Sequence, residues 1–342
     1  MKRPIKFIEN KEVNWTCVQE LLALSQRENH WANFGPVSRR LEQYVADFLS
    51  LSGDLEVVTA ASCTAALEAL SQTVYYQLGR KPRWVVSAFG FYATFRGAFA
   101  DAIIVDCDTT GLIDIEAVRQ IPDNEYDGVV FTNVFGQCSS PKKFVAFAES
   151  KDKYLLIDNA TGLTSFSERR VSPKIMETIS FHHTKPYGFG EGGCAILEKE
   201  MASTFRSILN FGGGLSNNPN NLGINGKLSD PAAAFILQRL ESMSEWRKPY
   251  TEQAERVARI AAGADLKPLC EHRTSKGFLQ AHVDLLAPRP INQETLVNEA
   301  LVLHKYYQPA GVNCENTNDI FARIINIPCH PGVSNLTSEE LE

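Results

Sequence analysis

The chain has 342 residues, more than one average domain, so a large and a smaller domain are expected. Hydrophobic residues make up 44% and charged residues 22% of the chain, as in an ordinary globular protein rather than a disordered one. A formal net charge of −6 argues against a broad basic surface for nucleic acid, although small anions can still bind locally.

The N-terminal segment MKRPIKFIENKEV is basic but lacks the apolar core and small-residue cleavage site of a signal peptide. No uninterrupted apolar stretch reaches the length of a membrane span. We therefore expect a cytoplasmic protein without a membrane partner. The eight cysteines lie far apart and form no C-x-x-C pair, which predicts reduced thiols and neither a disulfide framework nor a metal site.

From residue 57 to about 200, short apolar runs alternate with segments of helical pattern. This alternation predicts an α/β fold with a mainly parallel central sheet and helices on its faces. Such a sheet collects its ligands at the carboxyl ends of the strands. The predicted strands are Val57–Ala60, Trp84–Ala88, Ala102–Asp106, Gly128–Val134, Tyr154–Asp158, Thr178–Phe181 and Cys194–Leu197, and the predicted helices Ser62–Leu78, Asp114–Gln120 and Pro141–Ser150.

The pattern changes after residue 200. Asn210–Asn225, NFGGGLSNNPNNLGIN, is rich in Gly and Asn and predicts a long loop that is either functional or mobile. A domain boundary near residue 240 divides the chain into a large domain, 1–240, and a smaller α+β domain, 241–342. The elements predicted beyond the loop are helices at Pro231–Trp246, with Asp230 as N-cap, and near Thr251–Ala262, and strands at Leu279–Leu286 and Ile320–Ile327.

The segment TISFHHTKPYGFGEGGCAIL, Thr178–Leu197, carries the strongest chemical signal. An apolar strand ends just before Lys185, a glycine-rich loop follows, and another apolar strand begins. A lysine held in such a loop can lose solvation and have its pKa lowered, as an amine nucleophile requires. The common alternative is a solvated surface lysine. A dinucleotide-binding loop is excluded, because that motif needs a helix after its glycines and here a strand follows.

Three further features follow strand ends. Ser62, Cys63 and Thr64 stand at a predicted helix start, where free N–H groups can bind phosphate, although a plain N-cap is the alternative. Asp158 ends a buried strand, where a carboxylate needs a partner such as a protonated pyridine nitrogen or a structural arginine. Phe91 follows another strand, where it can stack on a flat ligand or pack in the core.

The order of these features resembles that of the DegT/DnrJ/StrS family of sugar aminotransferases, which have the fold type I architecture of pyridoxal-phosphate enzymes. The resemblance covers most of the chain. It is carried by SFHHTKPYGFGEGG (the lysine loop), SCTAAL (the phosphate turn), FGFYAT (the stacking aromatic), VVFTNVFGQ and LLIDNATG (two strand ends), LGINGKLSDPAAA (a stretch that reaches the neighbouring subunit's site) and INIPCHPGVS (the C-terminal motif).

Carried over residue by residue, the resemblance implies that Lys185 holds pyridoxal 5′-phosphate as a Schiff base. Asp158 would contact the pyridine nitrogen and Phe91 would stack on the ring. The remaining cofactor-binding residues implied are Cys63, Thr64, Thr161 and Ser180, with Asn225 contributed by the other chain of a homodimer that shares its active sites. Residues that can line the sugar site are Asn33, Tyr306, Tyr307 and His330, although each can equally be structural.

The implied reaction moves an amino group from an amino acid, typically Glu, to a keto group on a nucleotide-linked sugar. Lysine rather than histidine at position 185 favours amino transfer over dehydration of a sugar. The alternatives are a dehydratase or another reaction at an amino carbon, and a non-catalytic binding or regulatory relative. The chain departs from the family pattern at Cys63, usually Gly, at Asn159 and Thr161, and at its end, Glu342, where the family usually has another helix.

Overall fold

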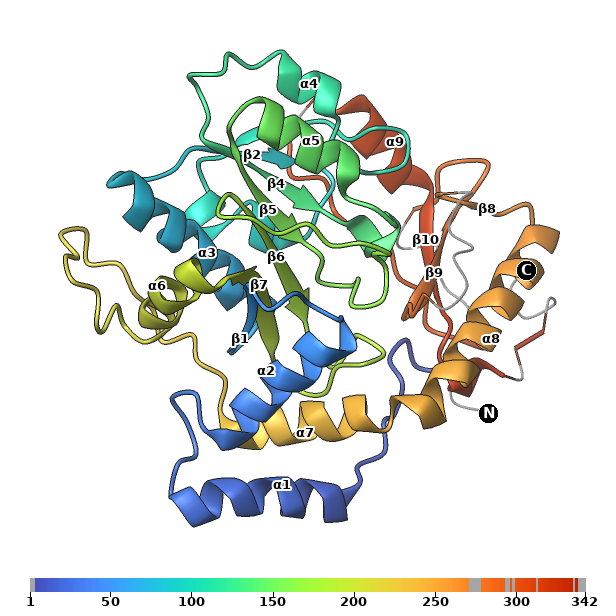
Figure 1. The fold of residues 1–342 in the computed structure, drawn as a ribbon. Helices are drawn as coiled ribbons and strands as arrows, with labels where there is room; N and C mark the ends of the chain where they lie inside the picture. The colour runs from blue at the N-terminus through green and yellow to red at the C-terminus, as the bar shows by residue number, and fades with distance from the viewer. Residues whose placement is uncertain are drawn as a thin grey trace.

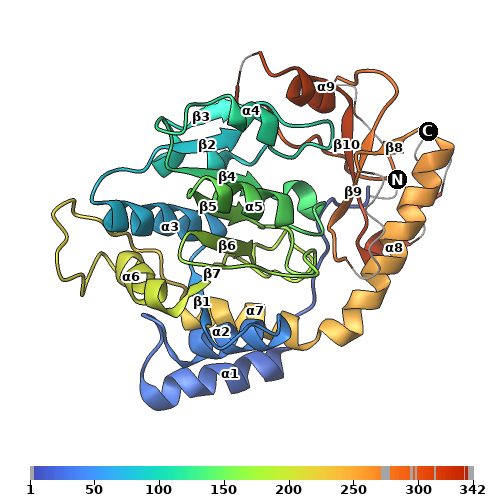
Figure 2. The ribbon, with the colours of Figure 1, turned by 45° about the horizontal axis from the view of Figure 1, so that its top comes forward.

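A seven-stranded sheet forms the centre of the computed structural model, which describes residues 4–270, 278–292, 296, 299–311, 313–334 and 336–337 (Figure 1). β7 runs antiparallel to both of its neighbours, and all other neighbouring pairs are parallel. The predicted mainly parallel α/β sheet is therefore confirmed. The strands follow one another across the sheet, as Figure 2 shows, in the order β1 (Leu55–Ala60), β7 (Gly193–Glu198), β6 (Ile175–Ser180), β5 (Tyr154–Asp158), β4 (Gly128–Thr132), β2 (Trp84–Ser87) and β3 (Ile103–Val105).

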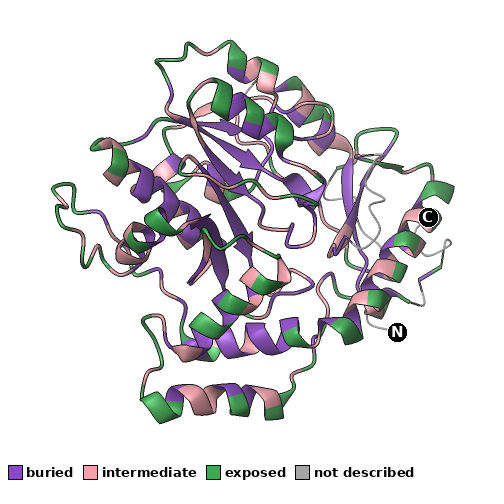
Figure 3. Ribbon diagram, in the orientation of Figure 1, coloured by how far each residue is buried: buried purple, intermediate pink, exposed green. Residues whose placement is uncertain are grey.

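Helices cover both faces of this sheet. The strands of the sheet are largely buried, as their purple colour in Figure 3 shows. Consecutive strand residues such as Leu155 and Leu156 belong to the apolar clusters on opposite faces, so the strands are continuous apolar runs. Burial of each such side chain contributes roughly 1.5–3 kcal/mol. One face is covered by α3 (Cys63–Leu78) and α6 (Lys199–Leu209), and the other by α2 (Pro36–Phe48), α5 (Lys142–Ser150) and α7 (Asp230–Glu241). α1 (Trp15–Glu28) packs against α2 and α7 (Figure 1).

The C-terminal part of the chain forms a second, three-stranded antiparallel sheet beside the first. α8 (Met243–Gly263) packs on this sheet. The domain boundary predicted near residue 240 stays a proposal, which this packing supports because α8 begins just after that residue. Ile5 near the N-terminus forms a bridge with Leu301, so the first residues also lie against this part. The other elements here are β8 (Lys267–Pro268), β9 (His282–Leu286), α9 (Glu315–Arg323) and β10 (Ile324–Pro328).

The helix predicted over Pro231–Trp246 is two helices, because α7 ends at Glu241 and α8 begins at Met243. The predicted N-cap was wrong as well. Ser229 caps α7, and Asp230 lies in its first turn. Asp230 is completely buried, where its carboxylate accepts hydrogen bonds from the backbone N–H groups of α2 and the hydroxyl groups of two serines. Tertiary partners on α1 and α2 thus outweigh the local capping role.

The strand predicted over Ile320–Ile327 begins only at Ile324, because residues 320–323 are the last turn of α9. A short continuous apolar run does not distinguish a buried strand from a buried helical turn. α1, α2 and α6 and the small 3₁₀ turns had no predicted counterpart. α4 (Ile115–Arg119) matches its prediction. None of the helices in the described ranges combines the length and the apolar character that crossing a bilayer requires.

Candidate active site

A cavity of about 400 Å³ lies where the carboxyl ends of β4, β5 and β6 meet the start of α3. Thr132, Asp158 and Ser180, the last residues of these three strands, all face it. The position agrees with the rule that parallel sheets collect ligands at this edge. The predicted site residues that line the cavity are Cys63, Thr64, Phe91, Asp158, Thr161, Ser180, Lys185, Tyr306 and Tyr307.

Three predicted residues lie outside this cavity. Asn225 is exposed on the long loop and accepts a hydrogen bond from Lys227 Nζ at 2.8 Å. Asn33 is exposed in the turn before α2 and has a φ of 54°. His330 is buried, with Nε2 2.8 Å from the Lys6 carbonyl oxygen and Nδ1 3.1 Å from a backbone N–H, so contacts within the chain engage both ring nitrogens.

Lys185 follows β6 in a tight loop and points its side chain into the cavity. Burial lowers the pKa of its amine, and the nearby Cys63 and Asp158 act in the opposite direction but more weakly. An amine with a lowered pKa carries a larger share of the unprotonated form, which is the form that attacks a carbonyl carbon. The predicted behaviour of this lysine is thus consistent with its position.

Asp158 at the end of β5 is 2% exposed. Burial raises the pKa of this carboxyl to about 6, and the hydrogen bond from Ala160 N (3.2 Å) and the nearby Lys185 offset only part of that effect. The sulfur of Cys63 lies 4.0 Å from Oδ1, and burial raises the pKa of this thiol, so it stays neutral. The site therefore holds a carboxylate that a cationic ligand would stabilise.

The start of α3 offers backbone donors to the cavity. The Ser62 side chain accepts from Ala65 N at 3.0 Å and caps the helix, while the N–H groups of Cys63 and Thr64 have no partner within the helix. β7 comes close because Gly193 has no side chain: a Cβ there would lie 2.4 Å from Cys63 N. Ser62 is therefore an N-cap, and the two N–H groups beside it leave anion binding at this helix start as a proposal.

Comparisons with known proteins show the family of the chain. The sequence model of the DegT/DnrJ/EryC1/StrS aminotransferase family matches residues 16–341. The chain belongs to this family.

Three relatives show how far the likeness extends. Protein Rv3402c of Mycobacterium tuberculosis is 28% identical over 332 residues, covering 88% of this chain and 80% of the relative. The dTDP-4-amino-4,6-dideoxy-D-glucose transaminase of Shigella dysenteriae is 24% identical over 358 residues, covering 94% and 92%. The structure of Helicobacter pylori PseC, an aminotransferase involved in the biosynthesis of pseudoaminic acid, superposes with a TM-score of 0.79 at 17% identity, covering 99% and 95%.

Family membership confirms the predicted enzyme class, an aminotransferase, and its cofactor, pyridoxal phosphate. The described residues fit that cofactor. The cavity offers an anion seat at α3, a buried amine at Lys185 and, at Asp158, a carboxylate suited to a protonated ring nitrogen. Its volume lies in the range of small-molecule sites, roughly 300–1,000 Å³.

An aromatic wall closes the side of the cavity near the second sheet. Phe91 is 46% exposed and meets the Tyr307 ring edge-on, with the centroids 5.9 Å apart. The rings of Phe135 and Tyr307 stack at 4.9 Å. A large ring that remains exposed inside a cavity is available to a flat ligand, so Phe91 keeps its predicted stacking role as a proposal.

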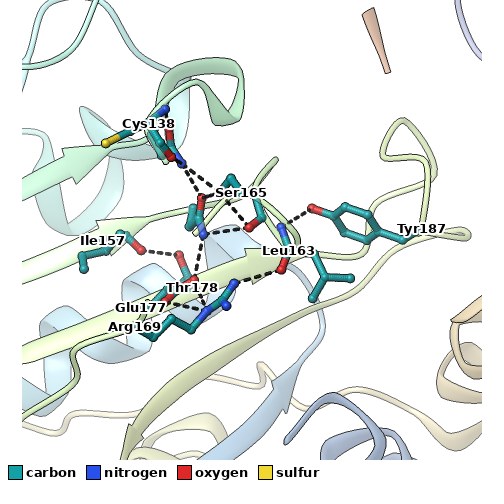
Figure 4. Close-up of polar contacts among 11 residues, drawn as sticks. Cys138, Ile157, Leu163, Ser165, Arg169, Glu177, Thr178 and Tyr187 are labelled. Atoms are coloured by element: carbon teal, nitrogen blue, oxygen red, sulfur yellow. Dashed lines mark hydrogen bonds and ion pairs between the residues drawn. The ribbon is translucent and has the colours of Figure 1, made fainter. Parts of the chain in front are cut away.

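A buried polar network explains the family departure at Asn159, and Figure 4 shows the part of this network around Ser165, Arg169 and Glu177. The Asn159 amide donates to Glu177 Oε1 at 2.7 Å and accepts from Asn133 Nδ2 at 2.8 Å. Arg169 lies 3.2 Å from the Glu177 carboxylate, and both side chains are almost fully buried. Each side chain of this network contacts at least one other member of it, so the network holds the turn that carries Asp158 and Thr161 in place.

Sequence reasoning missed several residues of the cavity. His282 on β9 faces it, and its Nδ1 lies 2.5 Å from Oδ1 of the buried Asp284. Gln280 and Phe7 line it as well. The signal in the sequence is the spacing of His282 and Asp284, which lie two residues apart on one strand and therefore point to the same face.

Proposed function

We propose that this member of the family moves an amino group from an amino acid, Glu in the first instance, to a keto group of a nucleotide-linked sugar. In this proposal Lys185 holds pyridoxal phosphate through a Schiff-base linkage. The observation that carries the proposal is the burial of the Lys185 amine in one cavity with a helix N-terminus and a buried carboxylate. The Shigella dysenteriae relative, a transaminase of a dTDP-linked amino sugar, supports the choice of acceptor.

Each described group has a separate task in the proposed reaction. Pyridoxal phosphate supplies an electron sink when bound. The N–H groups of Cys63 and Thr64, with the Ser180 hydroxyl, would hold its phosphate, and the Asp158 carboxylate would stabilise a proton on its ring nitrogen. With cofactor and substrate bound, the Lys185 amine would accept a proton from the substrate carbon and return it, because burial keeps part of the amine unprotonated.

The site is proposed to be completed by a second copy of the chain. Among the described residues that line the cavity, Lys185 is the one Lys or Arg, so the phosphates of a nucleotide have no further cation there. Asn225 is exposed on the loop between α6 and α7, outside the cavity of its own chain. We therefore propose a homodimer in which Asn225 of each subunit contributes to the cofactor site of the other.

The test of Lys185 is chemical. Protein loaded with pyridoxal phosphate is reduced with borohydride, digested and mapped by mass spectrometry. The expected adduct is on Lys185, and Lys185→Ala should lose both the visible absorbance band and at least about 10²–10⁴-fold in activity, the range of proton-transfer catalysis. Lys199→Ala, at an exposed lysine on the first residue of α6, should behave as the wild type. An adduct at another residue, or an active Lys185→Ala protein, contradicts the proposal.

The acceptor is tested with a panel of nucleotide-linked ketosugars, with Glu as the amino donor. Ping-pong kinetics and an aminated sugar product are expected. Loss of a hydroxyl group from the sugar without amination would point to the dehydratase alternative. Absence of any reaction in unreduced protein that is loaded with pyridoxal phosphate, when a reduced sample of the same protein carries the adduct at Lys185, would favour the non-catalytic alternative. Cross-linking or light scattering, together with Asn225→Ala, tests the shared site.

A further inference from the structure

Lys11 lies in the segment before α1 and is 8% exposed. Its ammonium group donates to three main-chain carbonyl oxygens of the loop that carries Lys185. The distances from Nζ are 2.7 Å to His183 O, 2.5 Å to Lys185 O and 2.6 Å to Gly188 O. An ammonium has three donors, so these three carbonyl groups use all of them.

A second buried cation completes the arrangement. Arg239 on α7 donates from Nε to Pro186 O at 3.0 Å, and its guanidinium lies 4.0 Å above the Trp246 ring. Its Nη2 atom pairs with Glu9 Oε2 at 2.8 Å, and the Tyr250 hydroxyl donates to the same oxygen. Four carbonyl groups of residues 183–188 are therefore held by two cations, with Glu9 as the nearby carboxylate.

The contacts of Lys11 shape the loop rather than fill the cavity. Lys11 does not line the cavity, whereas Lys185 does. The loop is tight, because a Cβ at Gly188 would lie 2.2 Å from the His182 carbonyl oxygen. Within it, Lys185 N donates to His182 O at 2.9 Å and Gly188 N donates to Lys185 O at 3.0 Å. The carbonyl groups of this loop thus contact Lys11, while the Lys185 side chain of the same loop lines the cavity.

Burial of this ammonium is costly, and its neighbours add to the cost. The pKa of Lys11 is lowered to about 7, chiefly by desolvation and also by the nearby Arg239 and Lys185, while Glu9 acts in the opposite direction. The segment from Glu9 to Lys11 is anchored to the Lys185 loop and α7 by these contacts, at a distance of more than 170 residues in the sequence. A group that is expensive to bury and makes three contacts to one catalytic loop acts through that loop.

We infer that Lys11 is a positioning residue for Lys185: its three hydrogen bonds hold residues 183–188 so that Lys185 Nζ meets the cofactor. The inference rests on the proposed role of Lys185 and goes beyond it, because it assigns a task to the N-terminal segment. Active-site groups need placement within about 0.5 Å, and a 1 Å displacement can cost about 10²-fold in rate. Loss of the three contacts should therefore slow the reaction of Lys185 without removing its amine.

The test compares Lys11→Met, which removes charge and donors at similar length, with Lys11→Arg, which retains both. Lys6→Met, at an exposed lysine of the same segment, is the matched control. The first measurement is the rate at which pyridoxal phosphate attaches covalently to Lys185 in folded, cofactor-free protein, followed by absorbance and confirmed by borohydride mapping. We expect at least about a tenfold slower attachment in Lys11→Met, a rate within about threefold of wild type in Lys11→Arg, and no change in Lys6→Met.

The second measurement is hydrogen exchange of the cofactor-free proteins. The amides of residues 183–190 should exchange faster in Lys11→Met, while those of β5 should not. Wild-type protein that fails to attach the cofactor at Lys185 overturns the proposed function itself. Attachment at Lys185 in the wild type, with a folded Lys11→Met chain that attaches at the same rate, overturns only the role of Lys11. A Lys11→Arg chain as slow as Lys11→Met also overturns it. If Lys11→Met does not fold, Lys11→Gln is judged by the same criteria.

Discussion

Replacement of Asp158 by Asn should make the cofactor-free protein more stable at neutral pH relative to acid pH. Burial raises the pKa of this carboxyl from 3.8 to about 6. A carboxyl whose pKa is higher in the folded chain contributes stability below about pH 4, and that contribution is lost as the pH rises through 6. The difference between 6 and 3.8 corresponds to about 3 kcal/mol at 1.36 kcal/mol per pH unit. The Asn side chain does not titrate and avoids this loss.

The assay is denaturant unfolding of cofactor-free wild type and Asp158→Asn between pH 4 and 7.5, at one protein concentration because a dimer is proposed. Between pH 4 and 7.5, the free energy of unfolding of the variant minus that of the wild type should rise by about 2–3 kcal/mol. Any pH-independent effect of the substitution adds a constant and does not change this rise. Asp54→Asn, at an exposed carboxylate, is the control and should show little shift in this stability difference. With the cofactor bound, the wild type should be the more stable of the two at neutral pH, because the variant lacks the carboxylate proposed to pair with the ring nitrogen. A pH-independent difference would refute the reasoning.

Two further substitutions test the geometry around the cofactor. Gly193→Ala places a methyl group 2.4 Å from a backbone nitrogen at the start of α3, so the affinity for pyridoxal phosphate should fall by at least about tenfold in a spectral titration. Gly53→Ala is the control, because nothing lies within 4 Å of the added methyl group, and it should leave this affinity unchanged. Glu177→Gln leaves Arg169 buried without its charge partner and should lower the free energy of unfolding, measured with denaturant, by about 3–5 kcal/mol. Glu168→Gln, which removes an exposed ion pair, should lower it by less than about 1 kcal/mol. Equal effects at either matched pair would contradict the structure.

The sequence by itself determined the sheet and the residues at its carboxyl edge. The apolar runs that end at Asp158 and just before Lys185 are buried strands of a parallel sheet, and their length and flanking glycines are local signals. The cavity residue Thr64 followed from its place at the start of the helix that follows a strand, whereas Ser180 was implied by the family resemblance.

Only the tertiary structure decided which distant groups meet at that edge. Lys11 reaches the Lys185 loop across 174 residues, and its segment has no periodicity that points to this contact. The sequence predicted Asp230 to be a helix cap, but in the structure its carboxylate accepts hydrogen bonds from groups on α1 and α2. Nothing in the sequence explained Asn159, which in the structure donates a hydrogen bond to Glu177. Sequence patterns report on the local chain, whereas the burial of a polar group depends on partners that only folding brings within hydrogen-bonding distance.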